Sequence, residues 1–546
     1  MKANHSGFRK AKTMRSRWLP LTVLAVTILA VGGLTACSNN SPADSVDRIL
    51  INGEEPARGL IPAAADDEAG IKIIDLLFAG LVTYDKQGQV INDVAQEITD
   101  SSDHKTWTIQ LNTDRKFSDG TPVLAKNFVR AWKTSAAQKL GATTAYEAIE
   151  GAEEDGTGNL SGVMANGDDK ITIKLKRPVA DFSNRLGING FYPLPDSAFD
   201  KQGKIKKEFG QKPVGNGPYT LTTWEPSSQI LLDKSTTYRG PREAKNAGVE
   251  VKIYADLSAA YQDLLAGNLD VLDQIPDGEL PNSKKDLGNR RISAVQAGMQ
   301  TLDIDYQTKH FSGEEGKLRR RAISQAINRE EIIKTIFYGT RKAATDFIPP
   351  QILGHIERGT ESNKVLEFDA VAAKQAWEAA DKIHPWQGEL KITYNSNESN
   401  QPWVDAICNQ LSNALGIKAV GDPKPDFKTL MEMMDQHSFT GPFRMGWSMG
   451  YPSPNNLLAG RYVKGGNGNK MGYDNPAYAE LLTRAQAADT ASEARELYQQ
   501  AQTLLLADLP SIPLWSPSSN IGFSQHVGKV TTDWKGEVAF HKVTRK

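Results

Sequence analysis

The sequence contains little cysteine and little histidine. Only Cys37 and Cys408 occur in 546 residues, and the eight histidines form no His-x-x-x-His motif. The sequence also has no Cys-x-x-Cys pair, so we expect no zinc site. We expect neither another metal nor a cofactor. Cys408 follows Val404 and Ile407 and precedes Leu411 at helical spacing, which predicts a buried core thiol rather than a reactive one.

Acidic residues are absent from the first 43 positions, whereas six Lys or Arg residues fall between positions 2 and 17. A run from Trp18 to Leu34 follows, apolar apart from Pro20, two threonines and two glycines. The run closes on Leu-Thr-Ala-Cys at positions 34–37. A basic region, an apolar region and a small-residue cleavage site are typical of a secretory signal peptide, which we assign to residues 1–36.

The four residues at the end of this segment resemble the bacterial lipobox, in which the Cys is acylated and becomes the mature N-terminus. Cys37 is therefore the expected lipidation site, and residues 37–46, rich in Ser and Asn, the expected linker. A diacylglycerol thioether supplies the two chains that stable anchoring needs. We expect an extracytoplasmic protein held at the cell membrane. The alternatives are an ordinary signal peptide and a single membrane-spanning anchor with a chance Cys.

Long apolar runs are absent beyond Leu34, so no later segment is expected to span a bilayer. An excess of positive charge is absent too, because the six early cations lie in the predicted signal peptide and the remainder is mildly acidic. That balance argues against a nucleic-acid partner.

Strand-like and helix-like stretches alternate over most of the chain, which indicates an α/β fold. Residues 390–394, 401–415 and 417–420 predict a β-α-β unit, and Asn328 with Glu331 predicts a helix N-cap. Other expected strands cover residues 46–52, 107–111, 171–175, 302–306 and 512–515. Other expected helices cover residues 71–78, 128–132, 257–265, 318–327, 476–487 and 492–507.

The segment 446–450 matches Gly-x-Ser-x-Gly, the nucleophile elbow of α/β-hydrolases. Acidic residues and His526 or His541 follow Ser448 in the order that such enzymes use. The elbow must run directly into a helix, whereas Pro452 and Pro454 disfavour helical geometry at this point. A secreted serine hydrolase acting through Ser448 is therefore a second alternative, and the main interpretation contains no catalytic residue.

Five stretches in order resemble solute-binding protein family 5, the peptide- and nickel-binding lipoproteins of bacterial ABC importers. The resemblance extends from about residue 46 to the C-terminus. The stretches are LLFAGLVTYD (76–85), KFSDGTPV (116–123), KPVGNGPY (212–219), LRRRAISQAINREEI (318–332) and GWSMGYPSP (446–454).

The resemblance implies a two-lobed periplasmic-binding-protein-like fold with a discontinuous lobe I, an inserted subdomain and a hinge-linked lobe II. Lobe I would comprise residues 47–300 and 510–546, the inserted subdomain 81–210 and lobe II 301–509. It also implies a monomer that binds an oligopeptide or another small solute between the lobes. The solute would pass to the permease subunits of an ABC importer.

The resemblance implies that a peptide lies extended in the cleft and pairs its main chain with protein strands, and the main chain of residues 446–449 is expected to take part in this pairing. Peptide-binding members commonly carry an Asp that receives the peptide ammonium where this sequence has Gly450. Acids elsewhere, including Asp435, are candidates to replace it, and an N-capped or non-peptide solute such as an oligosaccharide is an alternative. The expected ligand-binding residues are Gly446, Trp447, Ser448, Met449, Gly450, Tyr451, Glu54 and Glu55.

Overall fold

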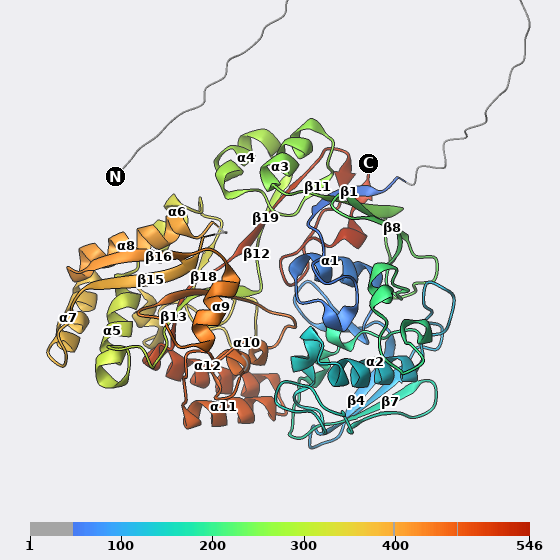
Figure 1. Ribbon diagram of the computed structural model, residues 1–546, viewed down its shortest axis with the longest axis horizontal. Helices are drawn as coiled ribbons and strands as arrows, with labels where there is room; N and C mark the ends of the chain where they lie inside the picture. The colour runs from blue at the N-terminus through green and yellow to red at the C-terminus, as the bar shows by residue number, and fades with distance from the viewer. Residues whose placement is uncertain (1–46, 397–398, 467) are drawn as a thin grey trace, which may run out of the picture. The chain divides into compact units, whose positions relative to one another are not determined.

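A computed structural model describes residues 47–396, 399–466 and 468–546, all within the compact unit Val46–Lys546 (Figure 1). Cys37, the predicted signal peptide and residues 37–46 lie outside the described residues, so their assignments stay predictions. Within the described part of the chain, none of the helices has both the length and the apolar character needed to cross a membrane.

A seven-stranded sheet organises the first half of the unit, with strand order β12-β19-β11-β1-β10-β9-β8. β1 pairs in parallel with β10 and β11, whereas β8, β9 and β10 form an antiparallel meander. We call this sheet and the elements packed on it lobe I. Its strands are β1 (Ile49–Gly53), β8 (Tyr219–Glu225), β9 (Gln229–Lys234), β10 (Gly248–Ile253), β11 (Val271–Leu272), β12 (Arg291–Val295) and β19 (Ser518–Phe523).

A six-stranded sheet organises the second half, with strand order β14-β18-β13-β17-β15-β16. We call this sheet and its helices lobe II. β15 and β16 are parallel and joined by α8 (Gln401–Leu415), which confirms the predicted β-α-β unit. The strands are β13 (Gly298–Asp303), β14 (Lys342–Ala343), β15 (Glu389–Asn395), β16 (Lys418–Lys424), β17 (Phe443–Ser448) and β18 (Ser511–Ser516).

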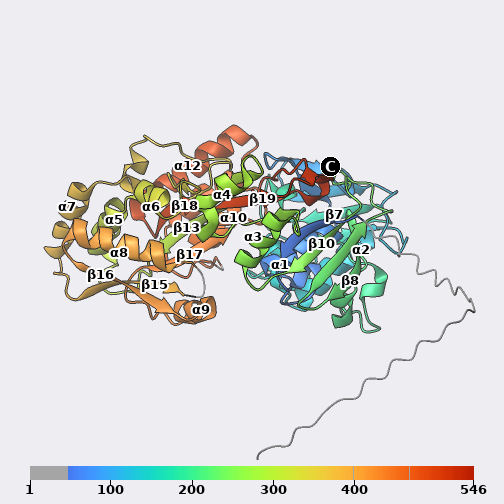
Figure 2. The ribbon, with the colours of Figure 1, turned by 90° about the horizontal axis from the view of Figure 1, so that it is seen from above.

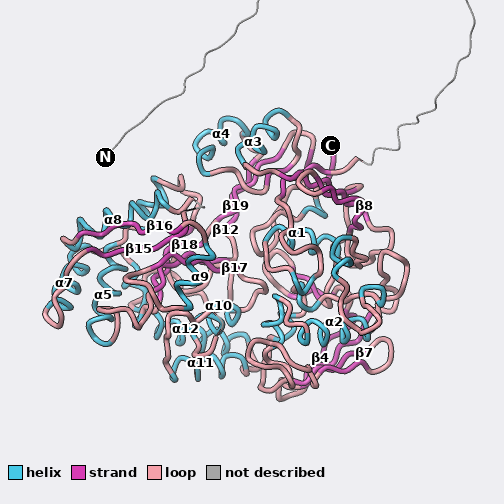
Figure 3. Tube along the Cα trace, viewed as in Figure 1, coloured by secondary structure: helices cyan, strands magenta, loops and turns pink. Residues whose placement is uncertain are grey.

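Two short crossings connect the sheets, one between β12 and β13 and one between β18 and β19. The chain thus leaves lobe I once and returns once, which makes lobe I discontinuous. The crossings lie side by side, because Gln296 N–H donates to Pro517 O at 2.8 Å and its side chain donates to Ser519 Oγ at 2.9 Å. Figure 3 labels β12, β18 and β19 beside the crossings, and Figure 1 also labels β13. Two adjacent single-chain crossings form the hinge between the lobes.

A smaller four-stranded antiparallel sheet, in the order β4-β5-β7-β6, is inserted between β1 and β8. With it come a hairpin, β2 (Val82–Tyr84) with β3 (Val90–Asn92), and the helix α2 (Ala125–Ala137). These elements share the hydrophobic core of lobe I. The strands are β4 (Ala95–Asp100), β5 (Thr106–Leu111), β6 (Val163–Ala165) and β7 (Lys170–Lys174).

Lobe II has two hydrophobic cores. Apolar residues of α5, α7 and α8 pack against the sheet in one core, and those of α9, α11 and α12 form the other. Figure 2 shows α8 and α9 on opposite sides of β15. The helices are α5 (Gly313–Ala326), α6 (Arg329–Thr335), α7 (Ala370–Asp381), α9 (Phe427–Asp435), α10 (Pro454–Tyr462), α11 (Pro476–Gln486) and α12 (Ala491–Asp508).

Local signals placed most of these elements correctly. The Asn328 side chain accepts from Glu331 N–H at 3.1 Å, which confirms the predicted cap of α6. Helices α1 (Glu68–Leu77) and α3 (Leu257–Ala266) lie where the apolar spacing predicts them, and α3 ends at Gly267 with φ of 84°. The strand expected at 302–306 was misplaced, because β13 begins at Gly298 and ends at Asp303.

Candidate functional site

Strand β17, which carries Gly446, Trp447 and Ser448, is paired very unequally on its two sides. Its six residues pair with β13, from Phe443 opposite Asp303 to Ser448 opposite Gly298. On the other side, the described residues of β15 pair with β17 at Phe443 alone. The main-chain edge of β17 beyond Phe443 therefore has no strand from β15 beside it.

The main-chain groups of Gly446 and Ser448 point toward this unpaired edge. Met449 N–H donates to Ala297 O at 2.8 Å, which orients Met449 toward the β13 side. Hydrogen-bonding directions alternate along an antiparallel strand, so Trp447 has the same orientation as Met449. Gly446 and Ser448 have the opposite orientation, and Ser448 is exposed. An extended ligand could add a strand here.

The end of this segment contacts the inserted subdomain of lobe I. The Tyr451 ring lies 5.5 Å from the Arg185 guanidinium, and the Asn184 side chain donates to Pro452 O at 3.0 Å. Ser453 Oγ donates to Asp181 and also caps α10. The segment 446–453 thus begins as a lobe II strand and ends against lobe I, so it lies at the boundary between the lobes.

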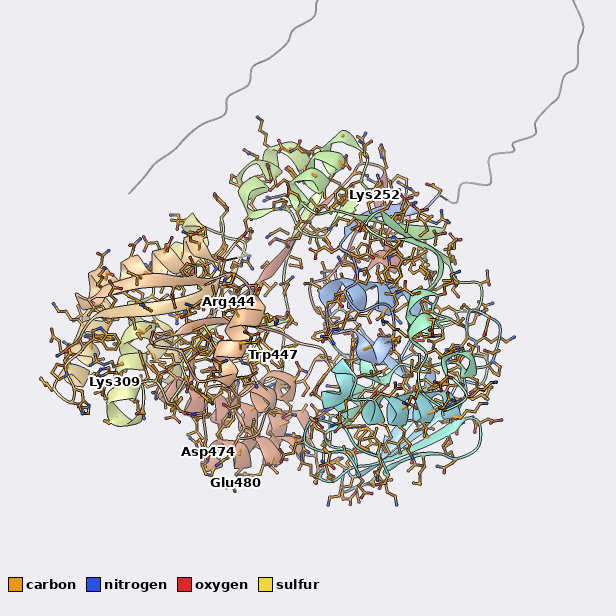
Figure 4. The ribbon with its side chains drawn as sticks, viewed as in Figure 1. Lys252, Lys309, Arg444, Trp447, Asp474 and Glu480 are labelled. Atoms are coloured by element: carbon orange, nitrogen blue, oxygen red, sulfur yellow. The ribbon has the colours of Figure 1, made fainter. Side chains whose placement is uncertain are left out.

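Arg444 is a functional candidate that the sequence reasoning missed. It lies two residues before Gly446 on β17, and Figure 4 shows it on this strand together with Trp447. Alternate residues of a strand share a face, so Arg444, Gly446 and Ser448 lie on one face and Trp447 on the other. The Arg444 guanidinium is half-buried and donates to Asn395 Oδ1 at 3.4 Å. Side chains alternate along a strand, so counting two residues back from Gly446 would have indicated that Arg444 lies on the same face.

Gly450 is exposed, and its backbone does not require glycine. It is not among the described glycines with positive φ. A Cβ built on it would meet only Ile188 Cγ2, at 3.9 Å, within 4 Å. Its N–H donates to Asn456 Oδ1 at 3.4 Å. The site therefore has room for a larger side chain, and steric hindrance does not explain why position 450 lacks an Asp.

The other acids considered as ammonium ligands have different surroundings. Glu55 accepts from Trp224 Nε1 at 3.0 Å and from Ser227 N–H at 2.8 Å, so both oxygens hold the β8–β9 turn of lobe I. Asp435 forms an ion pair with Lys470 at 2.7 Å. Glu54 is exposed, and its charge adds to burial in raising the pKa of Glu68 at the start of α1. The structure brings neither Glu54 nor Glu55 into a described contact with the 446–451 segment.

Ser448 lacks the geometry of a nucleophile elbow. It is the last residue of β17, and α10 begins only at Pro454 after an intervening loop. The candidate histidines belong to lobe I: His526 lies beside Gly267 at the end of α3. Burial, assisted by the charge of Arg242, lowers the pKa of His541 to about 3. Such an imidazole is a poor general base at neutral pH.

Cys408 is a core thiol, as expected. Its side chain is buried in α8, and burial raises its pKa to about 12, which leaves no reactive thiolate at neutral pH. In residues 47–396, 399–466 and 468–546, no group of three or more His, Cys, Asp or Glu side chains is arranged to hold a metal ion.

Comparison with known proteins identifies the family of this chain and several relatives. Residues 89–469 match the family model described as bacterial extracellular solute-binding proteins, family 5 Middle. The oligopeptide-binding protein OppA of Bacillus subtilis is 25% identical over 96% of this chain and 99% of its own. The probable deoxycholate-binding periplasmic protein YgiS of Escherichia coli is 26% identical over 87% of this chain and 89% of its own.

Among solved structures, the murein tripeptide binding protein MppA of Escherichia coli superimposes with a TM-score of 0.76. It is 22% identical and covers 92% of this chain and 99% of its own. This likeness shows that the two chains share a fold. The matched family model covers well over half of the 546 residues. The chain therefore belongs to the family 5 bacterial extracellular solute-binding proteins.

Proposed function

We propose that this protein is the lipid-anchored receptor of an ABC importer, binding oligopeptides between its lobes and delivering them to the permease subunits. The observation that carries the proposal is the unpaired edge of β17 at Gly446 and Ser448, at the boundary between the lobes. A peptide main chain supplies the complementary donors and acceptors by strand addition, with little dependence on side-chain identity.

The two crossings explain how capture and release are combined. A ligand that contacts both lobes favours the closed state, and loss of one set of contacts favours the open one. The lobe boundaries that we propose are the crossings themselves, at residues 296–297 and at Pro517. They replace the expected 300 and 510, because β18 (Ser511–Ser516) belongs to the sheet of lobe II. The receptor acts as a monomer, and no catalytic residue, metal or nucleic acid takes part.

Native mass spectrometry of protein purified without denaturation tests the proposal directly. We expect co-purified peptides, which calorimetry of the stripped protein should then show to rebind with one site per chain. A stripped protein that binds none of a mixed peptide library would contradict the proposal.

A non-peptide or N-capped solute is the alternative within the same class. It is favoured by Gly450, which offers no carboxylate to a peptide ammonium, and by the relative YgiS, a probable deoxycholate-binding periplasmic protein. In that case, the same mass spectra should contain ligand masses that do not correspond to any unmodified peptide.

A third reading, hydrolysis by Ser448, makes a different prediction. The loop between Ser448 and Pro454 removes the helix start that an elbow needs, so we expect no ester hydrolysis above a heat-killed control. Assays with activated esters should be run on wild type and on Ser448→Ala. Turnover that disappears in Ser448→Ala would support the hydrolase.

The anchor is tested through Cys37. We expect Cys37→Ser to leave the body folded but to move it from the membrane fraction to the medium, or to leave the signal peptide uncleaved, because a hydroxyl cannot form the thioether. Cys408→Ser is the matched control, since it removes the other thiol and should leave fractionation unchanged. A Cys37→Ser protein that is processed at the same bond and stays with the membrane would rule out the lipobox.

A further inference from the structure

A second feature lies beside the hinge, away from the unpaired edge of β17. A cavity of ≈ 320 Å³ is bordered by the two hinge strands, at Met299 of β13 and Ser516 of β18, and by the edge strand β14. Water occupies about 30 Å³ per molecule in the liquid, so the cavity has room for a hydrated small ion. Its remaining border comes from α6 and from the 344–358 segment.

The cationic side chains of the border come from neighbouring positions. Arg341 immediately precedes β14, which begins at Lys342. Lys342 lies directly opposite Ser516 in the β14–β18 pair, so Lys342 and Ser516 share a face. Arg358 also borders the cavity, but it forms an ion pair with Glu330 at 2.6 Å. His355 is likewise engaged, with Asp346 at 3.1 Å. Arg341 and Lys342 therefore dominate the charge that faces the cavity, with the exposed Glu357 at its border.

Arg341 is held in place but incompletely paired. Its guanidinium lies 4.6 Å above the Phe337 ring, and its side chain is 18% exposed. Its nearest described carboxylate, Asp277 of lobe I, is 3.9 Å away, whereas charge-assisted hydrogen bonds are typically about 2.7–2.9 Å long. Its Nε is buried and has no described hydrogen-bond partner. Burial lowers the pKa of Arg341 despite Asp277, as expected for a cation that lacks a close counter-ion.

We propose that this cavity binds an oxyanion, a carboxylate or phosphate group, with Arg341 as its principal ligand and Lys342 and Ser516 as further donors. A guanidinium presents paired N–H groups that match such an anion. Because Asp277 belongs to lobe I and the cavity to lobe II, the anion competes with a contact between the lobes. Its occupancy is thus coupled to the hinge. The oxyanion has two sources, a free ion or the acidic end of the transported solute.

Calorimetry with inorganic phosphate and the full-length protein in detergent tests the free-ion source. At low ionic strength, we expect saturable binding that weakens at least about tenfold in Arg341→Gln. Lys309→Gln removes an exposed cation of the same lobe (Figure 4) and should leave phosphate affinity unchanged. Asp277→Asn should tighten binding, because it removes the competing carboxylate while leaving the cavity border intact.

The second arm tests the solute source by titrating one peptide as its free acid and as its C-terminal amide. A preference for the acid that Arg341→Gln abolishes assigns the oxyanion to the solute. If wild type and Arg341→Gln bind phosphate with equal affinity, the phosphate is an adventitious ion only. If, in addition, the ratio of the affinities for the free-acid and amide peptides is the same in both proteins, the proposal is overturned. If Arg341→Gln does not fold, Asp277→Asn is measured in its place. The proposal is overturned if Asp277→Asn has the same phosphate affinity and the same preference between the free-acid and amide peptides as wild type. If the peptide does not bind at all, the proposed function is contradicted. The phosphate titration still tests the anion site, because it does not depend on peptide binding.

Discussion

Replacement of Ser448 by proline should weaken peptide binding by about 1.5–3 kcal/mol, roughly 10- to 150-fold, without unfolding the protein. Ser448 N–H points away from β13, so proline removes no hydrogen bond from the β13–β17 pair. Proline is tolerated at such an edge position. It does remove the donor that a ligand strand would use, and its ring occupies the space of the incoming main chain.

The matched control is Ser448→Ala, which removes the hydroxyl and keeps the main-chain donor. It should change affinity by less than about 1 kcal/mol. Calorimetry gives the affinities, and circular dichroism with a melting curve verifies that both variants fold. A series of peptides, each N-methylated at one position, tests the same pairing on the wild-type protein, because each methyl group removes one main-chain donor of the ligand. If Ser448→Pro binds as wild type does, and no N-methylation weakens binding, the ligand does not pair with this edge.

The second large effect concerns the amino end of the ligand. Wild type should bind a peptide and its N-acetylated analogue with similar affinity, because Gly450 offers no carboxylate. Gly450→Asp should then favour the free amine by about 1–3 kcal/mol, the range of a close charge pair less its desolvation. The substitution is structurally acceptable, since Gly450 lacks a positive φ and a Cβ there meets only Ile188 at 3.9 Å.

Gly450→Asn is the control for this second test, because it adds nearly the same volume without the charge. It should leave the two peptides equal. A wild type that already rejects the acetylated peptide by tenfold, about 1.4 kcal/mol, would mean that another acid holds the amine. Glu54→Gln would then be the first variant to measure, because Glu54 is exposed whereas Glu55 and Asp435 are already engaged.

Local sequence signals predicted the elements well where a short stretch contains its own determinants. The cap at Asn328, the glycine stop at Gly267 and the β-α-β unit around α8 all depend on residues a few positions apart. The family motifs act in the same way, because each is a contiguous stretch. Five of them in order sufficed to indicate the family that the matched model shows.

The candidate site was predicted only in part. The motif predicts that the 446–451 segment binds the ligand, and Glu55 is predicted as a candidate ligand of the peptide ammonium. The structure engages it with Trp224 and Ser227, residues about 170 positions away. Arg444 was overlooked because a strand face alternates, and the motif began after it.

The sequence by itself determined the α/β alternation, the caps and the buried Cys408, because short-range periodicity encodes them. Its contiguous motif also indicated the candidate ligand segment 446–451. Only the tertiary structure decided that β17 pairs with β13, some 145 residues earlier, and that β15 leaves its other edge unpaired. It alone brought Arg341 within 3.9 Å of Asp277 beside the hinge. Strand partners and inter-lobe contacts join segments whose local patterns carry no record of one another, so they appear only when the chain is folded.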